Sequence, residues 1–182
     1  MEQINNSERH GYRLRGDIWL KVGNNLSRED VLAYPDLQKK NLIVDIASDQ
    51  LAEWAIQGSS PTVPGILTLA VGTGDGFFDL QNPPAPTASQ TLLEGELARK
   101  IFADKTYVNT GTLLPTATRT NIIDLTTTFL EAEAVGPLVE MGLFAGTGAL
   151  STNSGTMINY ITFSVINKPS TSELSIIWRL TF

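Results

Sequence analysis

The chain has 182 residues, 42% of them hydrophobic, with no cysteine, one histidine and a formal net charge of −6. Without cysteine it has neither disulfides nor thiol chemistry, and one imidazole cannot build a zinc site of the Cys/His type. His10 lies in a polar stretch near the N-terminus, which is a poor place for a catalytic triad. Because 19 acidic residues outnumber 13 basic ones, no basic stripe for nucleic acid is expected.

The N-terminal segment differs in character from the rest of the chain. It is polar through Gly11 and does not resemble a signal peptide, and no apolar run is long enough to cross a bilayer. We therefore expect no membrane partner. We expect residues 1–11 to be a flexible arm that orders on a neighbouring subunit, and residues 12–182 to be a single domain held by its hydrophobic core.

Hydrophobic patterning along the chain predicts mostly strands. Over 12–22, Ile18 and Leu20 alternate with charged residues, which predicts a half-buried strand. The segment 24–40 is charged and interrupted by a proline, so we expect a polar connection there. An apolar run over 66–71 predicts a buried strand, followed by a glycine turn and a Pro-rich surface loop. Further strands are predicted over 119–130, 138–144, 157–166 and 174–182.

Two segments predict helices. Hydrophobic residues over 41–57 recur at the three-and-four spacing of one helix face, with Asn41 as a cap and Gly58 as a stop. Residues 91–99 predict a short helix with leucines inward, which gives way to strand over 100–108. The elements together predict a mainly β fold: an antiparallel, jelly-roll-like β-sandwich with one amphipathic helix and one short helical segment.

No group of residues predicts catalysis, a cofactor or a metal. The glycine turn 72–76 follows a strand, but no helix begins after it, as a phosphate cradle requires. Asp75 and Asp79 lack the dense alternation of ligands found in calcium loops. Neither they nor Glu131 and Glu133 form a recognisable pair for acid–base chemistry. We therefore name no catalytic, cofactor-binding or metal-binding residue, and expect no enzyme activity.

One group of charged residues is expected to interact inside the domain. Glu140 lies in an otherwise apolar strand, so a buried carboxylate there needs a partner. Arg99, three residues after Glu96, is the obvious donor because a guanidinium binds a carboxylate through two parallel hydrogen bonds. We interpret Glu96, Arg99 and Glu140 as a structural ion pair rather than as a binding site.

Four aromatic residues are candidates for an interface. Phe77 and Phe78 are adjacent in the Pro-rich loop, and they would serve either as anchors for a partner or as a plug for the open end of the sandwich. Trp178 and Phe182 share one face of the last strand, where packing against a partner and packing in the core are both compatible with the pattern.

Several pieces of sequence occur in a characteristic order: RGDIWLKV, KNLIVDIASDQLAEWA, LTLAVGTG, TLLEGELAR, FLEAEAVGPLVEMGLF, GTMINYITFSVINK and LSIIWRLTF. Their order and spacing resemble a diffuse family of small structural proteins of tailed-bacteriophage virions. The resemblance implies a β-sandwich subunit at the capsid surface, the head–tail neck or collar, or the tail. It also implies that the subunit is made in the host cytoplasm and ends up in the virion.

The leading hypothesis is a non-enzymatic virion structural protein that forms a homo-oligomer or docks on other virion proteins. The alternative is a host-receptor or glycan-binding module of a phage tail or fibre, because jelly-roll-like sandwiches often carry such sites. A small hydrolase acting on cell-wall glycans is a third class, for which no carboxylate can be nominated.

Overall fold

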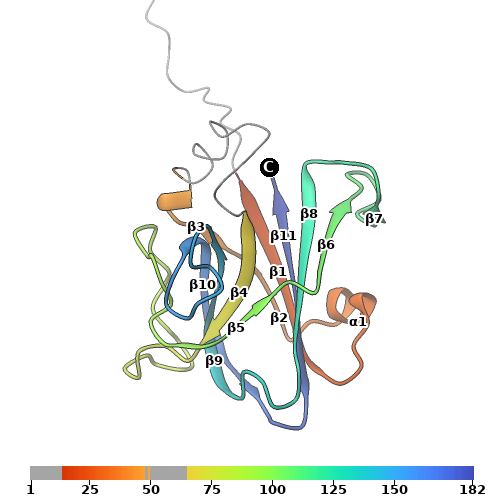
Figure 1. Cartoon of the computed structure of the whole chain (residues 1–182). Coiled ribbons are helices and arrows are strands. Elements are labelled where there is room, and N and C mark those ends of the chain that lie inside the picture. The colour runs from red at the N-terminus through yellow and green to blue at the C-terminus, as the bar shows by residue number, and fades with distance from the viewer. Residues whose placement is uncertain (1–13, 48, 50–64) are drawn as a thin grey trace, which may run out of the picture.

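The computed structural model describes residues 14–47, 49 and 65–182, and Figure 1 labels its elements. The expected arm over 1–11 lies outside these residues. In chain order the elements are β1 (Arg15–Gly23), α1 (Arg28–Ala33), β2 (Leu37–Lys40), β3 (Leu42–Ile43), β4 (Ile66–Gly72), β5 (Glu96–Ile101), β6 (Asp104–Val108), β7 (Pro115–Thr116), β8 (Ile122–Phe129), β9 (Gly136–Ala145), β10 (Thr156–Lys168) and β11 (Glu173–Thr181).

The strands form two antiparallel sheets that lie against each other (Figure 1). The six-stranded sheet has the order β2-β1-β11-β8-β6-β7, and the five-stranded sheet has the order β3-β10-β9-β4-β5. The sheets are not closed into a barrel. The predicted mainly β, antiparallel sandwich is therefore confirmed.

The main core lies between the sheets and follows the two-residue period of the strands. In β1, Ile18 and Leu20 are fully buried, as their alternation predicts. In β11, which lies between β1 and β8, the inward side chains are all fully buried: Leu174, Ile176, Trp178 and Leu180. The first and last described strands are thus neighbours, with Arg15 opposite Thr181.

A second, smaller hydrophobic cluster covers the outer face of the five-stranded sheet. Phe144 and Tyr160 from the sheet pack there with Leu93 and Ala149 from the loops 73–95 and 146–155. Burial on both faces explains why β9 and β10 read as nearly continuous apolar runs rather than as alternating ones.

The segment expected to be a polar connection contains α1 and β2. The helix begins with a capping box, in which Ser27 Oγ accepts from Asp30 N–H at 3.1 Å and Asp30 Oδ2 accepts from Ser27 N–H at 2.9 Å. Val31 is 2% exposed, and α1 contacts β1 and β11. The prediction failed because a helix of only 6 residues buries a single apolar side chain and leaves no periodic signal.

The helix expected over 41–57 is wrong at its start. Leu42 and Ile43 form β3, opposite Tyr160 and Asn159 of β10. Helical conformation is present at 46, 47 and 49, and residues 50–57 lie outside the described part of the chain. Pairing with a strand distant in sequence overrides the local helical pattern at this point.

The short helical segment expected over 91–99 is also wrong. Residues 96–101 are β5, which pairs with β4 and places Arg99 opposite Ala70. The strand predicted over 100–108 is present in two parts, the last residues of β5 and the whole of β6, with a break at 102–103. Just before β5, a Cβ on Gly95 would lie 1.9 Å from the carbonyl oxygen of Gly74, so the chain passes very close to the turn after β4.

The Pro-rich loop runs along the sheet instead of projecting from it. The carbonyl oxygen of Leu80 accepts from Val165 N–H at 2.7 Å, and that of Pro84 accepts from Thr162 Oγ1 at 2.7 Å. The turn before it has positive φ at Gly74 (73°) and Gly76 (83°), as the glycine cluster predicts. The loop is therefore tied to β10 at Leu80 and at Pro84.

We predict that Gly95→Ala strongly destabilises the domain, because the added methyl collides with the backbone of Gly74. The free energy of unfolding in urea should fall by about 2 kcal/mol or more. Gly65→Ala is the matched control, since nothing lies within 4 Å of a Cβ there. Equal stability of the two variants would contradict the close approach of the two turns.

Candidate functional site

Glu96 and Arg99 form the predicted ion pair, but on a strand. Arg99 Nε and Nη2 donate to the two carboxylate oxygens of Glu96 at 2.8 and 2.7 Å. Residues three apart on a regular strand point to opposite faces. Here the register of β5 shifts between Val71 and Gly72 of β4, and this irregularity brings the two side chains to the same face.

The pair is buried and holds a neighbouring loop. The side chains of Glu96 and Arg99 are 0% and 3% exposed. Arg99 Nη1 also donates to the carbonyl oxygens of Ala149 and Ser154 at 3.0 and 2.7 Å, and its guanidinium lies 3.8 Å from the centre of the Phe144 ring. The arginine thus ties the loop 146–155 to the outer face of the five-stranded sheet.

Glu140, the third member of the predicted group, has different partners from those expected. Its Oε1 accepts from the backbone N–H of Gly95 at 2.8 Å and of Gly74 at 3.2 Å. Its Oε2 accepts from Glu94 N–H at 3.1 Å and from the Tyr160 hydroxyl at 2.8 Å. The expectation that Arg99 serves Glu140 is corrected: backbone amides and a phenol satisfy this fully buried carboxylate.

This carboxylate holds together the two turns that flank the Pro-rich loop. The donors come from the turn after β4 and from the turn before β5, so one side chain fixes both ends of the loop 73–95. Gly72 is required beneath it, because a Cβ there would lie 2.5 Å from Glu140 Oε1. Burial raises the pKa of the Tyr160 hydroxyl, and the charge of Glu140 raises it further.

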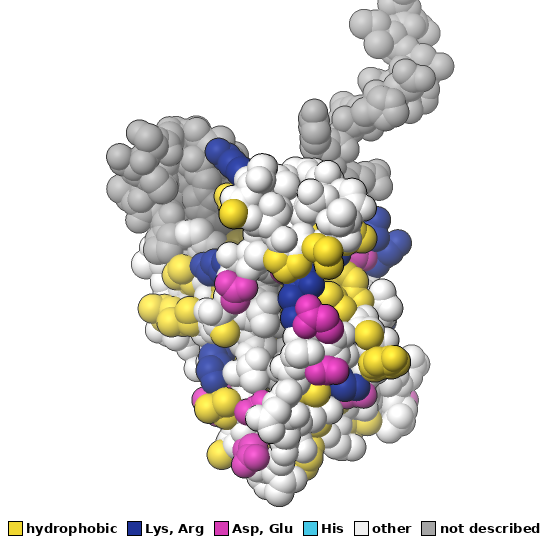
Figure 2. Space-filling view, turned by 90° about the vertical axis from the view of Figure 1, so that its right-hand side faces the viewer, with side chains coloured by type: hydrophobic (Ala, Val, Ile, Leu, Met, Phe, Trp, Pro, Cys, Tyr) yellow, Lys and Arg dark blue, Asp and Glu magenta, His cyan; other side chains and the backbone are white. Residues whose placement is uncertain are grey.

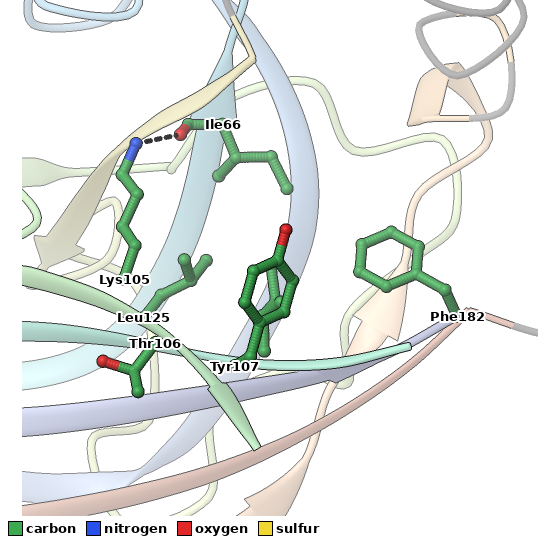
Figure 3. Close-up of a pocket in the computed structure, with 7 residues that line it drawn as sticks. Ile66, Lys105, Thr106, Tyr107, Leu125 and Phe182 are labelled. Atoms are coloured by element: carbon green, nitrogen blue, oxygen red, sulfur yellow. Dashed lines mark hydrogen bonds between the residues drawn. The ribbon is translucent and has the colours of Figure 1, made fainter. Parts of the chain in front are cut away.

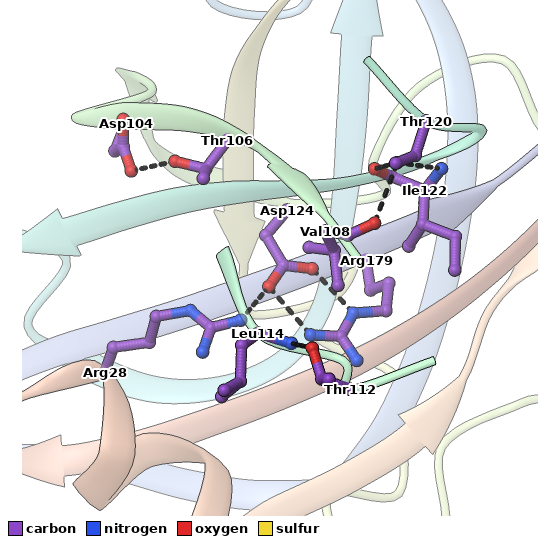
Figure 4. A network of polar contacts seen from close by, with 10 residues as sticks. All are labelled: Arg28, Asp104, Thr106, Val108, Thr112, Leu114, Thr120, Ile122, Asp124 and Arg179. Carbon is purple, nitrogen blue, oxygen red and sulfur yellow. Dashed lines mark hydrogen bonds and ion pairs between the residues drawn. The ribbon is translucent and has the colours of Figure 1, made fainter. Parts of the chain in front are cut away.

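A second buried ion pair was missed by sequence reasoning (Figure 4). Arg179 Nε and Nη2 donate to Asp124 at 2.7 and 2.9 Å, and Arg28 from the start of α1 also binds this carboxylate. Asp124 and Arg179 are 1% and 8% exposed and lie opposite each other on β8 and β11. The sequence shows only that each of two apolar strands contains a charged residue. That these two residues form a pair becomes clear only when the register of β8 and β11 is known.

The four interface candidates lie in different environments. Phe77 is 94% exposed, whereas Phe78 is half-buried over Gly74, where a Cβ would lie 2.6 Å from its ring. Phe182 is 41% exposed. Trp178 is fully buried in the main core opposite Ile18 and Leu125, so its assignment to an interface is wrong. The alternation of apolar residues in a strand cannot distinguish a tryptophan in the core from one in an interface, because both show the same pattern.

A hollow of about 410 Å³ opens between β4 and β6 (Figure 3). Tyr107 and Phe182 both line it with their rings, and Lys105 Nζ donates to the Ile66 carbonyl oxygen at 3.0 Å. An adjoining hollow of about 650 Å³ shares Tyr107 and Phe182 and is lined further by polar side chains, namely Arg119, Thr120 and Asn121. The two hollows together present aromatic rings beside hydrogen-bonding groups.

The acidic residues of the glycine turn stabilise the turn itself. Asp75 Oδ1 accepts from Phe77 N–H at 2.8 Å, and Asp79 Oδ1 accepts from Gln81 N–H at 3.0 Å. Within the described residues, no group of three or more His, Asp or Glu side chains is placed to hold a metal ion. None of the helices described is both long enough and apolar enough to cross a membrane.

Neither a scan against protein-family models nor a search of curated proteins finds a match for this chain. No relative therefore supplies a role for Glu140, Asp124 or Phe77. Their roles follow from their contacts, burial and charge.

We predict that Glu140→Gln destabilises the domain by about 2–4 kcal/mol, because an amide NH₂ would face hydrogen-bond donors in a buried site. Urea unfolding measures the loss, and faster exchange of the Gly74 and Gly95 amides would locate it. Glu131→Gln is the matched control, since its side chain is exposed. A variant as stable as the control would refute the role given to this carboxylate.

The raised pKa of Tyr160 predicts a loss of stability at alkaline pH. Above about pH 10 the tyrosine ionises in the unfolded chain but stays protonated in the folded one, so the unfolded state gains stability. This group alone contributes a slope of up to about 1.4 kcal/mol per pH unit. Unfolding of the wild type and Tyr160→Phe between pH 9 and 11 measures it, and the variant should show the shallower decline. Parallel curves would mean that the hydroxyl is not buried against Glu140.

Proposed function

We propose that the chain is a non-enzymatic structural subunit of a tailed-bacteriophage virion, which self-associates or docks on other virion proteins. Its place is the capsid surface, the neck or collar, or the tail. The observation that carries the proposal is Phe77, a ring 94% exposed on a loop that is held at both ends. An aromatic side chain presented on a fixed loop is the kind of anchor that dominates protein interfaces.

The anchoring contacts of this loop lie on either side of Phe77. Gly74 N–H donates to Glu140 before it, and the Leu80 carbonyl accepts from Val165 N–H after it. A loop that is ordered before binding loses little conformational entropy when a partner covers it. The free energy of binding is therefore not reduced by the cost of ordering the loop. The fixed loop therefore suits repeated docking in a particle.

The buried charged groups support a scaffold role. Glu140 is satisfied by fixed amides, and the pairs Glu96–Arg99 and Asp124–Arg179 are closed by two hydrogen bonds each. A catalytic carboxylate needs access to substrate and a proton to exchange. These carboxylates instead join elements that are distant in sequence.

The surface also suits contact with neighbours. Only 18% of the residues are charged. On the face shown in Figure 2, basic and acidic side chains alternate among larger areas of uncharged polar surface, with hydrophobic side chains in small groups. Such a surface imposes little electrostatic repulsion between copies packed side by side.

We expect the chain to be present in purified phage particles, where mass spectrometry detects it and electron microscopy places it in a symmetric ring or lattice. Phe77→Ser should lower its incorporation by about ten-fold, because a central aromatic anchor is lost. Tyr34→Ser is the matched control, since Tyr34 is 74% exposed at the end of α1. A chain that is monomeric in solution and missing from particles would overturn the proposal.

The second candidate is a host-receptor or glycan-binding module of a tail or fibre, and the hollow beside Phe182 favours it. Tyr107 and Phe182 offer rings for stacking, and Arg119 and Asn121 offer hydrogen bonds to hydroxyl groups. Saturable binding of a host cell-wall oligosaccharide that is lost in Arg119→Ala would support this function over the first.

A further inference from the structure

We infer that two copies of this chain associate through the free edge of β5, by antiparallel pairing of β5 with β5. The inference rests on the proposed function and specifies one surface for it. Strand β5 forms one edge of the five-stranded sheet, so one side of its backbone is not paired within the described fold. An unpaired strand edge is a template for another strand.

The four sheet edges differ in how well they are protected. Strands β3 and β7 are 2 residues long, and β7 begins with Pro115, which cannot donate a hydrogen bond. Strand β2 has only 4 residues and ends in the exposed Lys40, whose charge discourages pairing. Strand β5 has 6 residues and no proline. Its register irregularity lies at its first two residues, so the stretch 98–101 pairs regularly with β4, and neither a proline nor an irregularity interrupts that stretch.

The two basic residues of β5 do not protect it, because both are neutralised within the same subunit. Arg99 is bound by Glu96 and is 3% exposed, and Lys100 forms an ion pair with Glu133. A lysine prevents pairing at a strand edge when the pairing would bury its charge without a partner. The edge is therefore locally neutral, so a second copy meets no net charge at this strand.

Apolar side chains lie at both ends of β5. Ile101, 57% exposed, and Leu150, 63% exposed, line a hollow of about 460 Å³ at one end. Leu97, 42% exposed, lies beside Gly136 at the other end, next to Val135, which is 41% exposed. An apolar surface of a partner that covers both ends of β5 would therefore remove these side chains from water.

The symmetry of this arrangement points to a second copy as the occupant. A twofold axis across an antiparallel β5–β5 pair places the Leu97 end of one copy against the Ile101 end of the other. The single twofold axis thus covers the apolar side chains at both ends, and the neutral centre of β5 in one copy lies opposite the same residues of the other copy. The two five-stranded sheets would become one continuous sheet across the dimer.

The size of the contact predicts its strength. A strand of 6 residues is about 20 Å long, and its edge alone buries less than the roughly 800 Å² per partner of a stable interface. Leu150 on the loop 146–155 and Val135 on the opposite side extend the contact. We therefore expect a weak dimer in solution, which many simultaneous contacts would reinforce in a particle.

The test is the oligomeric state of the full chain by sedimentation over micromolar to millimolar concentrations. We expect reversible dimerisation, weakened about ten-fold or more by Ile101→Lys, which would bury a charge without a partner. Leu114→Lys is the matched control, because Leu114 is 59% exposed beside the six-stranded sheet. Hydrogen exchange adds a second measurement: the amides of β5 should become protected as concentration rises, and those of β2 should not.

Each outcome decides between the inference and the function on which it rests. A wild-type chain that stays monomeric throughout, or a dimer that Ile101→Lys does not weaken, overturns the β5 pairing. If that same chain is still incorporated into particles, the virion function stands with another contact surface. If it is missing from particles, the proposed function fails as well.

Discussion

The fold depends on a buried carboxylate whose hydrogen-bond donors, among the described residues, are all uncharged. Glu140 is neutralised by the dipoles of backbone amides and by the hydroxyl of Tyr160. Removing these donors would leave a charge in the core at a cost of several kcal/mol, so the turns that supply them are held in place. This one carboxylate therefore joins Gly74 to Gly95 and fixes the start of the loop that carries Phe77.

Each sheet also carries a buried arginine–carboxylate pair on its outer face. Asp124–Arg179 lies under α1 on the six-stranded sheet, and Glu96–Arg99 lies under the loop 146–155 on the five-stranded sheet. In both cases the arginine or the carboxylate also binds a segment outside the sheet. The pairs therefore fasten the covering segments to the sheets.

How much could be predicted depends on whether the information is local. The alternation in β1 and β11 predicts burial because each residue's face is set by its own strand. The helix over 91–99 was wrong because pairing with β4 and the contact at Gly95 are long-range facts. Glu96 and Arg99 were matched by helical spacing, yet a strand irregularity brings them together. The donors to Glu140 are backbone amides, which carry no signature in the side-chain sequence.

The position of β11 has a consequence for biosynthesis. This strand lies at the centre of the six-stranded sheet, and its partner β1 is the first of the described strands in chain order. The sheet therefore cannot close until nearly the whole described chain has emerged, and folding is slow because its contacts span a long stretch of sequence. Until then β1 and β8 lack the strand that joins them, so the six-stranded sheet is completed only after β11 has been translated.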